Sequence, residues 1–225
     1  MSETGARREV IARAREMAGM GLAGGTSGNL SRRWGEGFLI TPSGIAYDAL
    51  APGDIVAMSL DGAAHGRRAP SSEWRVHRDI FRARPEVGAI VHTHSLYATT
   101  LAIAGRDIPA LHYMIAAAGG PTIRCAPYAT YGSQVLSDHA LAALGGRMAC
   151  LLAHHGVLAL GDSLTRALWL AGEVETLAHH YYNALALTPV LGAPAVLPDE
   201  EIARVVEKFR AYGPKGDPKG DSDEN

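Results

Sequence analysis

Cysteine is scarce in this sequence, and long apolar runs are missing. The two cysteines, Cys125 and Cys150, belong to no CxxC pair, so a disulfide scaffold and an all-thiolate metal site are not expected. No apolar run approaches the ~20 residues that a membrane-spanning helix requires. The polar N-terminal stretch, MSETGARREV, resembles neither a signal peptide nor a membrane anchor. These absences predict a protein of the reducing cytoplasm.

An excess of charge of either sign is also missing. The 21 Lys and Arg residues nearly balance the 23 Asp and Glu residues, and the net charge is −2. The basic residues form no stripe with interleaved aromatics, so neither a nucleic-acid partner nor a membrane surface is expected. The sequence contains no internal repeat, GxSxG elbow or cysteine-nucleophile motif. The length of 225 residues and the 47% hydrophobic content are typical of one ordinary globular domain.

The periodicity of apolar residues predicts helices that interleave with short strands. The expected helices cover residues 3–20, 71–84, 95–104, 133–146, 164–187 and 199–213, and the expected strands cover 29–34, 37–44, 54–62, 87–94 and 148–161, the last as two strands or one bent strand. No βαβ series is regular enough for a doubly wound sheet. We therefore expect a single three-layer α/β domain over residues 1–213, with a central, mostly antiparallel sheet flanked by helices. Residues 214–225 are a charged, low-complexity tail that should be disordered.

A pair of histidines ends the apolar strand VGAIVHTH. Side chains of a strand alternate between its faces, so His92 and His94 point the same way. Neutral imidazole suits Zn²⁺, and HxH on a strand is a common pair of metal ligands. Two hydrogen-bonded histidines without a metal are the simpler interpretation of this motif alone.

Two further stretches add candidate ligands. In LLAHHGVLAL, His154 and His155 follow another apolar strand, and only one of these neighbours can easily join the HxH pair. In PSSEWRVH, a helix that begins with Ser71, Ser72 and Glu73 offers free backbone N–H groups to an anion. Glu73 is either part of an ordinary capping box or a carboxylate that serves as metal ligand or general base.

Small polar residues and glycines form two more stretches, GGTSGNLS and ITPSG. Thr26, Ser27 and Asn29 supply donors in the first, and residues 41–44 repeat this chemistry in the second. Each is either a plain turn or an anion cradle, and no Lys follows the glycines as a Walker P-loop requires. Together these stretches indicate a phosphate held by hydroxyls and backbone amides beside a Lewis acid.

In this order, GTSGNLS, ITPSG, PSSEWRVH, HTH and HHG resemble the motifs of the class II aldolase/adducin family. IPALHYMIAAAGG, CAPYATYG and DEEIARVVEKFRAYG extend the resemblance, which covers residues 5–213. It implies a homotetramer of α/β subunits with active sites at the subunit interfaces. It also implies one Zn²⁺ per subunit, bound by His92, His94 and His155, with Glu73 able to join the metal.

The resemblance further implies the substrate site. The residues expected to bind the phosphate are Gly28, Asn29, Ser43, Gly44, Ser71 and Ser72, with Thr26 beside them. Tyr113 matches a proton donor from a neighbouring subunit, and Tyr212 matches a mobile C-terminal tyrosine. Tyr131 and Phe209 are expected with Tyr212 around the aldehyde. Glu73 would act as general base, while Zn²⁺ acts as Lewis acid on the ketone.

The implied activity is reversible cleavage of a ketose 1-phosphate to dihydroxyacetone phosphate and a small aldehyde. Candidate substrates are L-fuculose 1-phosphate and the 5-deoxy and 5-methylthio derivatives of ribulose 1-phosphate. Two alternatives remain open: an L-ribulose-5-phosphate 4-epimerase, and a non-catalytic adducin-type module. The retained histidines and Glu73 favour an enzyme over the module.

Overall fold

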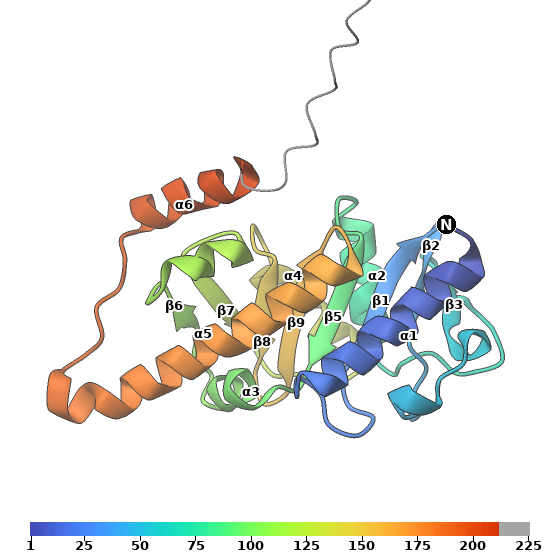
Figure 1. Cartoon of the computed structure of the whole chain (residues 1–225), viewed down its shortest axis with the longest axis horizontal. Helices are drawn as coiled ribbons and strands as arrows, with labels where there is room; N and C mark the ends of the chain where they lie inside the picture. Colours follow the sequence, from blue (N-terminus) through green and yellow to red (C-terminus); the bar gives the residue numbers. More distant parts are fainter. Residues whose placement is uncertain (212–225) are drawn as a thin grey trace, which may run out of the picture.

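The computed structural model describes residues 1–211, in which helices and strands interleave along the chain (Figure 1). The helices are α1 (Glu3–Gly19), α2 (Trp74–Ala83), α3 (Leu96–Ile103), α4 (Gln134–Ala143), α5 (Leu164–Leu191) and α6 (Asp199–Ala211), with 3₁₀ turns η1 (Tyr47–Ala49), η2 (Pro52–Asp54) and η3 (Tyr113–Ala118). The strands are β1 (Asn29–Trp34), β2 (Gly37–Ile40), β3 (Val56–Ser59), β4 (Ala64–His65), β5 (Ala89–Thr93), β6 (Ile108–Pro109), β7 (Thr122–Ala126), β8 (Ala149–Leu152) and β9 (Gly156–Gly161). Tyr212 and the tail over residues 214–225 lie outside the described residues.

One sheet runs through the described chain, in the strand order β4-β3-β2-β1-β5-β9-β8-β7-β6. Every pairing is antiparallel except that of β7 with β8. The helices α1, α3 and α5 cover one face, and α2 and α4 cover the other (Figure 1). The expected three-layer domain with a mostly antiparallel sheet is therefore confirmed.

The central strand β5 explains why both faces need helices. All five of its residues are buried, with Ala89 and Val91 in the core on the α1 and α5 side. Ile90 belongs to the second core, beneath α2 and α4. A strand that is apolar on both faces must be covered twice, because each face removes its own apolar surface from water.

The order of the strands fixes where the site forms. β5 pairs with β1 on one side and β9 on the other, and Asn29 lies opposite His92 in the β1–β5 register. On β5, His92 has the same parity as Ile90, so it points toward the α2 side. The end of β5, the start of β1 and the N-terminus of α2 consequently meet at one end of these central strands.

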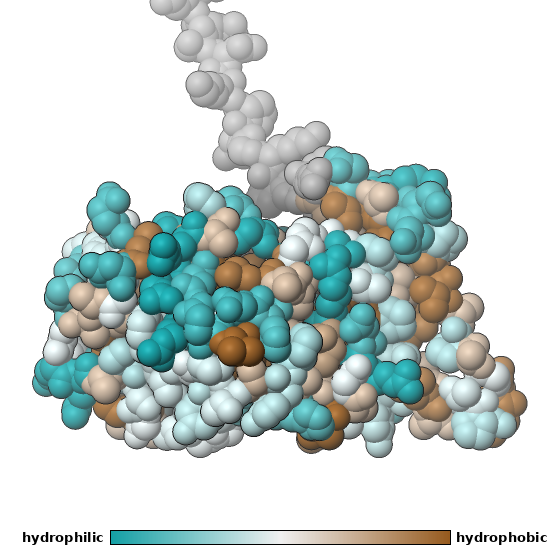
Figure 2. Space-filling view, turned by 180° about the vertical axis from the view of Figure 1, so that it is seen from behind, coloured by the Kyte–Doolittle hydropathy of each residue, from teal (hydrophilic) through white to brown (hydrophobic). Residues whose placement is uncertain are grey.

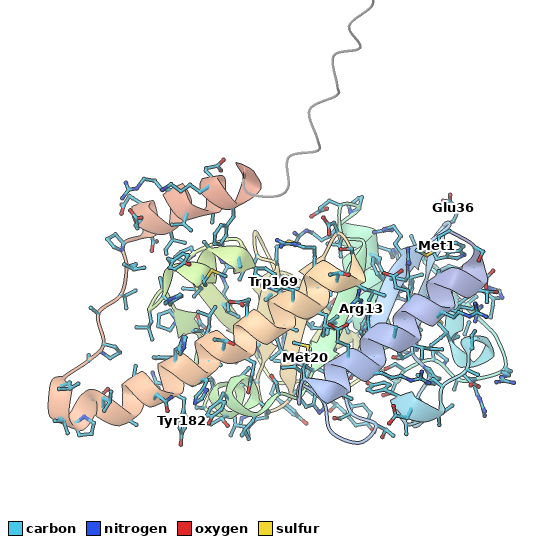
Figure 3. All side chains as sticks on the ribbon, viewed as in Figure 1. Met1, Arg13, Met20, Glu36, Trp169 and Tyr182 are labelled. Atoms are coloured by element: carbon cyan, nitrogen blue, oxygen red, sulfur yellow. The ribbon has the colours of Figure 1, made fainter. Side chains whose placement is uncertain are left out.

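The long helix α5 packs against α1 along the front of the molecule. Met20, which caps α1, lies between the two helices in Figure 3, and a Cβ on Gly172 would lie 3.1 Å from the Met20 Cε. The last part of α5 extends beyond the sheet (Figure 1). Tyr182, Leu187 and Val190 there are exposed. Among the described residues, no helix combines the length and apolarity needed to span a membrane.

Several boundaries differ from the sequence prediction. The expected strands 37–44 and 54–62 shorten to β2 and β3, because Ser43 and Gly44 form a turn after the first and Leu60 and Asp61 form a turn after the second. The short strand β7 was not predicted, and α5 continues to Leu191 with Pro189 in its last turn. Residues 148–161 form two strands, β8 and β9, rather than one bent strand.

Figure 2 shows the molecule from behind the view of Figure 1, on the side of α2 and α4. Hydrophilic residues predominate on this face.

Candidate metal centre and substrate pocket

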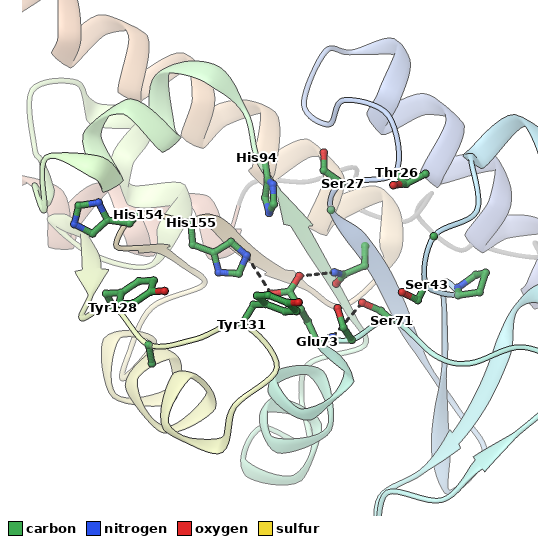
Figure 4. Close-up of a pocket in the computed structure, with 16 residues that line it drawn as sticks. Thr26, Ser27, Ser43, Ser71, Glu73, His94, Tyr128, Tyr131, His154 and His155 are labelled. Atoms are coloured by element: carbon green, nitrogen blue, oxygen red, sulfur yellow. Dashed lines mark hydrogen bonds and ion pairs between the residues drawn. The ribbon is translucent and has the colours of Figure 1, made fainter.

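A pocket of about 340 Å³ opens where β1, β5 and the N-terminus of α2 meet (Figure 4). Its lining residues are Thr26, Ser27, Gly28, Asn29, Pro42, Ser43, Gly44, Ser71, Ser72, Glu73, His94, Tyr128, Ala129, Tyr131, His154 and His155. Segments that are far apart in the sequence thus share one cavity. The structure brings every residue proposed for the phosphate to this wall, together with Tyr131.

Three histidines and one glutamate converge on the floor of the pocket. One ligand atom from each of His92, His94, His155 and Glu73 lies within 4.8 Å of the other three. His92 Nε2 lies 3.0 Å from His94 Nε2 and 3.1 Å from Glu73 Oε2. His155 Nε2 lies 3.2 Å from Glu73 Oε1. The described residues hold no other such group of potential metal ligands.

His92 is the most constrained of the three. It is buried, and its Nδ1 donates to the backbone oxygen of Val157 at 2.8 Å. Because Nδ1 carries the proton in this bond, Nε2 presents a lone pair to the cluster when the ring is neutral. This is the usual arrangement of a metal-binding histidine, in which the second ring nitrogen is fixed by an outer hydrogen bond.

His155 reaches the cluster from the turn between β8 and β9. Gly156 allows this approach, since a Cβ there would lie 2.2 Å from the backbone oxygen of Thr93. His154, its neighbour, has a φ of +56° and lies at the rim beside Tyr128, with ring centroids 6.0 Å apart. The expectation that only one of the two joins the cluster agrees with this geometry. The reason is different, because both residues stand in a turn and not in a strand.

The electrostatics of the cluster match a cation site. Although burial alone raises the pKa of Glu73, the nearby His92 and His155 lower it well below its usual range. Burial and the neighbouring His92 lower the pKa of His94 and of His155 to about 4. Burial also lowers the pKa of His92, but the Glu73 carboxylate outweighs burial and raises it. The cluster therefore combines an ionised carboxylate with two imidazoles, those of His94 and His155, that stay neutral and can offer lone pairs to a cation.

These donors fit a zinc ion. Three imidazole nitrogens and one carboxylate oxygen form a donor set typical of Zn²⁺, and Zn–N distances near 2.0–2.1 Å place tetrahedral ligands about 3.3 Å apart. The separations of 3.0 Å for His92–His94, 3.1 Å for His92–Glu73 and 3.2 Å for His155–Glu73 are close to this value, and all four ligand atoms lie within 4.8 Å of one another. The residues present thus have the chemistry and the spacing that such a metal needs.

The glycine-rich loop forms a second wall of the pocket. Gly28 has a φ of +75°, and a Cβ on it would lie 2.7 Å from the backbone oxygen of His92. Only glycine combines this left-handed backbone with so close an approach. Below the loop, the Tyr47 hydroxyl donates to the backbone oxygens of Ser27 and Gly28 at 3.0 and 2.8 Å. Burial raises the pKa of Tyr47, so the phenol remains a donor.

The remaining polar wall comes from Ser43, Gly44, Ser71 and Ser72. Ser71 Oγ accepts from the backbone N–H of Glu73 at 3.3 Å. Among the described residues that line the pocket there is no Lys or Arg. Any anion bound here by this chain would meet hydroxyls, an amide and backbone N–H groups.

The prediction for the helix start needs a correction. α2 begins at Trp74, and Glu73 is its N-cap rather than a member of its first turn. The expected capping box is absent from this helix, because the Glu73 side chain turns to the histidines and to Asn29 instead. The competing interpretation of Glu73, as a carboxylate aimed at the histidines, is the one that the geometry supports.

One tyrosine from the prediction, Tyr113, does not line this pocket within the chain. Tyr113 starts η3, is half-exposed, and lies beside Phe209 with ring centroids 6.4 Å apart. Phe209, expected near the aldehyde, therefore packs against η3. Tyr212 lies outside the described residues.

Sequence reasoning missed three residues that shape the site. Tyr47 supports the glycine loop, Tyr128 lines the rim, and His77 is buried behind Asn29. Their positions in the sequence carried little signal. Tyr128 belongs to the quoted stretch CAPYATYG and His77 to PSSEWRVH, but nothing in the periodicity distinguishes either from an ordinary core or loop residue.

Comparison with known proteins gives the class. Residues 8–182 match the family described as the class II aldolase and adducin N-terminal domain. Over 207 residues, the chain is 53% identical to the 5-methylthioribulose-1-phosphate/5-deoxyribulose-1-phosphate aldolase of Rhodospirillum rubrum, covering 92% of each. It is 49% identical to the L-fuculose phosphate aldolase of Escherichia coli K12, covering 92% of this chain and 94% of that protein.

A solved structure of L-fuculose 1-phosphate aldolase shares the fold, with a TM-score of 0.87 and 41% identity over 93% of this chain and 98% of that one. The chain therefore belongs to the class II aldolase and adducin family, and it is an enzyme of the aldolase type. The sequence-based resemblance to this family is confirmed.

Proposed function

We propose that the chain is a zinc-dependent aldolase that cleaves a ketose 1-phosphate to dihydroxyacetone phosphate and a small aldehyde. The observation that carries this proposal is the meeting of His92, His94, His155 and Glu73 beside a pocket of glycines and hydroxyls. The relatives that act on 5-methylthioribulose, 5-deoxyribulose and L-fuculose phosphates support the substrate class. When bound, the metal supplies a Lewis acid that stabilises negative charge developing on the substrate oxygens.

Glu73 is the proposed general base. Its carboxylate is ionised, and it projects from the N-terminus of α2 into the pocket. In the condensation direction it removes a C3 proton from dihydroxyacetone phosphate, and the electron pair left on C3 forms the new bond to the aldehyde carbon. In cleavage it returns the proton to C3 after the C3–C4 bond breaks. A positioned base of this kind typically contributes about 10²–10⁴-fold to the rate.

The hydroxyl-rich wall is the proposed phosphate site. Gly28, Asn29, Ser43, Gly44, Ser71 and Ser72 hold the phosphate, with Thr26 beside them. Ser71 and Ser72 stand just before α2, whose free N–H groups favour an anion. The phosphate is then fixed by geometry, without a positively charged side chain from the same chain.

The tyrosines complete the proposal. Tyr131 lines the open side of the pocket and faces the aldehyde. Tyr113, which is half-exposed and does not line the pocket of its own chain, acts as proton donor in the site of a neighbouring subunit, and Tyr212 closes over the aldehyde. The proposal therefore includes active sites between subunits, in the homotetramer that the family resemblance implies. The exposed apolar residues at the end of α5 support assembly, because isolated helices rarely leave such a surface in water.

Two free thiols, Cys125 and Cys150, fit a reducing cytoplasm.

The contribution of Tyr113 to the active site of a neighbouring subunit can be tested by complementation. Glu73→Gln and Tyr113→Phe should each be nearly inactive. Mixing the two variants under conditions that exchange subunits should restore activity, since some interfaces then combine an intact Glu73 with an intact Tyr113. Light scattering gives the number of subunits. Two variants that remain inactive after exchange would contradict a shared site.

The reaction itself is tested by a product assay. We expect the purified protein, with zinc, to release dihydroxyacetone phosphate from ketose 1-phosphates and to lose this activity on chelation. L-ribulose 5-phosphate, tested in parallel, distinguishes the aldolase from the epimerase alternative. Epimerisation of that sugar without cleavage of the 1-phosphates would replace the aldolase proposal.

A further inference from the structure

A buried histidine lies behind the proposed phosphate site without lining the pocket. His77 follows Glu73 by one turn of α2, and its side chain is fully buried. One helical turn advances 5.4 Å, while side chains on the same face of a strand are about 6.6 Å apart. The spacing of Glu73 and His77 along α2 is therefore close to the spacing of Asn29 and Ser31 along β1. Hydrogen bonds join the four side chains.

The hydrogen bonds define the direction of the Asn29 amide. Asn29 Nδ2 donates to Glu73 Oε2 at 2.9 Å, and Asn29 Oδ1 lies 2.5 Å from His77 Nε2. Since Oδ1 can only accept, His77 Nε2 carries the proton. His77 Nδ1 is then an acceptor, and the Ser31 hydroxyl donates to it at 2.6 Å. Burial and the neighbouring His92 lower the pKa of His77 to about 3, so the ring stays neutral.

We infer that His77 is a positioning residue, which holds the Asn29 amide with its nitrogen toward Glu73 and the pocket. An amide nitrogen has two N–H groups. One is used by Glu73, and the second remains for an oxygen of the phosphate in the pocket that Asn29 lines. If the amide turned over, its oxygen would face the Glu73 carboxylate and offer the phosphate no donor. This inference rests on the proposed function, because that function assigns the phosphate to Asn29.

Two amide substitutions at His77 separate this role from simple packing. In His77→Gln, the side-chain nitrogen reaches the position of Nε2 and can still donate to Asn29. In His77→Asn, the shorter side chain reaches only the position of Nδ1, so it can contact Ser31 but not Asn29. The two variants differ by one methylene and are equally polar. Ile80→Val, at another buried position of α2, controls for a loss of stability of about 1 kcal/mol.

Calorimetric binding of dihydroxyacetone phosphate at saturating zinc is the measurement. His77→Asn should weaken binding about tenfold or more, the order expected when a hydrogen bond to a charged group is lost, whereas His77→Gln and Ile80→Val should stay within about twofold. In an Asn29→Ala background, His77→Asn and His77→Gln should bind the ligand equally. Such a failure of additivity is the signature of a residue that acts through another.

The outcomes are distinguishable. If the unmodified protein does not bind dihydroxyacetone phosphate, the proposed function fails and this inference falls with it. If the unmodified protein binds it and the Asn and Gln variants are alike, the proposed function stands and only the role of His77 is overturned. Additive effects of His77 and Asn29 would overturn it as well. Should His77→Asn fold poorly, His77→Gln decides, because it should keep the affinity of the unmodified protein within about twofold; a tenfold loss of affinity in His77→Gln beside an unchanged Ile80→Val would overturn the role of His77.

Discussion

The glycine loop offers the sharpest comparison, because two of its glycines have a similar backbone and different surroundings. Gly25 and Gly28 both have a left-handed backbone, with φ of +61° and +75°. A Cβ on Gly25 would meet nothing within 4 Å, whereas a Cβ on Gly28 would lie 2.7 Å from the backbone oxygen of His92. Substituting each by Ala therefore separates backbone strain from steric conflict.

The magnitudes follow from these contacts. A left-handed backbone costs an L-residue roughly 1–2 kcal/mol, and this is the whole expected loss of stability for Gly25→Ala. Gly28→Ala adds an overpacking term of about 1–3 kcal/mol, for a total near 2–5 kcal/mol. Relief of the conflict must also move the loop from β5, and Asn29, which pairs with His92, moves with it. Affinity for dihydroxyacetone phosphate should then fall about tenfold or more in Gly28→Ala and by less than about twofold in Gly25→Ala, which leaves the hydrogen bond of Asn29 to a charged group intact.

Urea denaturation and calorimetric binding measure the two quantities. Equal losses of stability in both variants would show that the loop moves away from β5 without a further loss of stability. The close approach of Gly28 to β5 would then have no consequence. Unchanged affinity in a destabilised Gly28→Ala would refute the placement of the phosphate at this loop.

Three further predictions concern the cluster. His155→Ala should lose bound zinc, while His154→Ala should retain it; elemental analysis of the purified variants decides, and the reverse result would exchange their assignments. His154→Gly should raise the free energy of unfolding by about 1 kcal/mol, because it removes the strain of a non-glycine residue at a φ of +56°; a denaturation midpoint below that of His154→Ala would contradict this. Glu73→Gln should abolish exchange of the C3 proton of dihydroxyacetone phosphate with solvent, followed by NMR, while phosphate binding persists; unchanged exchange would identify another base.

The parts of the site that sequence alone could reveal are those set by local geometry. His92 and His94 share a face because a strand alternates with a period of two, and this holds whatever packs around it. The position of Glu73 needed more. Its local signal is a helix cap, and only the packing of α2 on β1 and β5 turns its carboxylate toward the histidines.

Long-range pairing explains the elements that the sequence did not predict. β7 is five residues long and is defined by its parallel pairing with β8, which lies more than twenty residues further along the chain. Similarly, His77 looks like any polar residue near a helix start until Ser31 and Asn29 are brought beside it. A role for Tyr113 in a neighbouring subunit depends on assembly, which no pattern within one chain can specify.

The two ends of the pocket should differ in selectivity. At the proposed phosphate end, Asn29 and Ser71 are buried, so a substrate that lacks the phosphate should leave buried donors unpaired at about 1–3 kcal/mol each. With two such donors, the loss is about 2–6 kcal/mol, so dihydroxyacetone should react about 30-fold to 10⁴-fold less well than its phosphate. At the aldehyde end, Tyr128 and Tyr131 are 60% and 67% exposed, and a change of one methylene is worth only about 1–3 kcal/mol even in an enclosed pocket.

The values of kcat/KM for the 1-phosphates of fuculose, 5-deoxyribulose and 5-methylthioribulose should therefore lie within about 100-fold of one another, as that limit implies. Steady-state cleavage rates, measured with coupled reduction of dihydroxyacetone phosphate, give the three values. Tyr131→Phe should change them by similar factors, because an exposed hydroxyl at the rim contacts each aldehyde weakly. A preference far beyond this range for one sugar would show that the aldehyde end is enclosed by a neighbouring subunit or by residues beyond 211, and that selectivity is built by assembly and not by the pocket of the single chain.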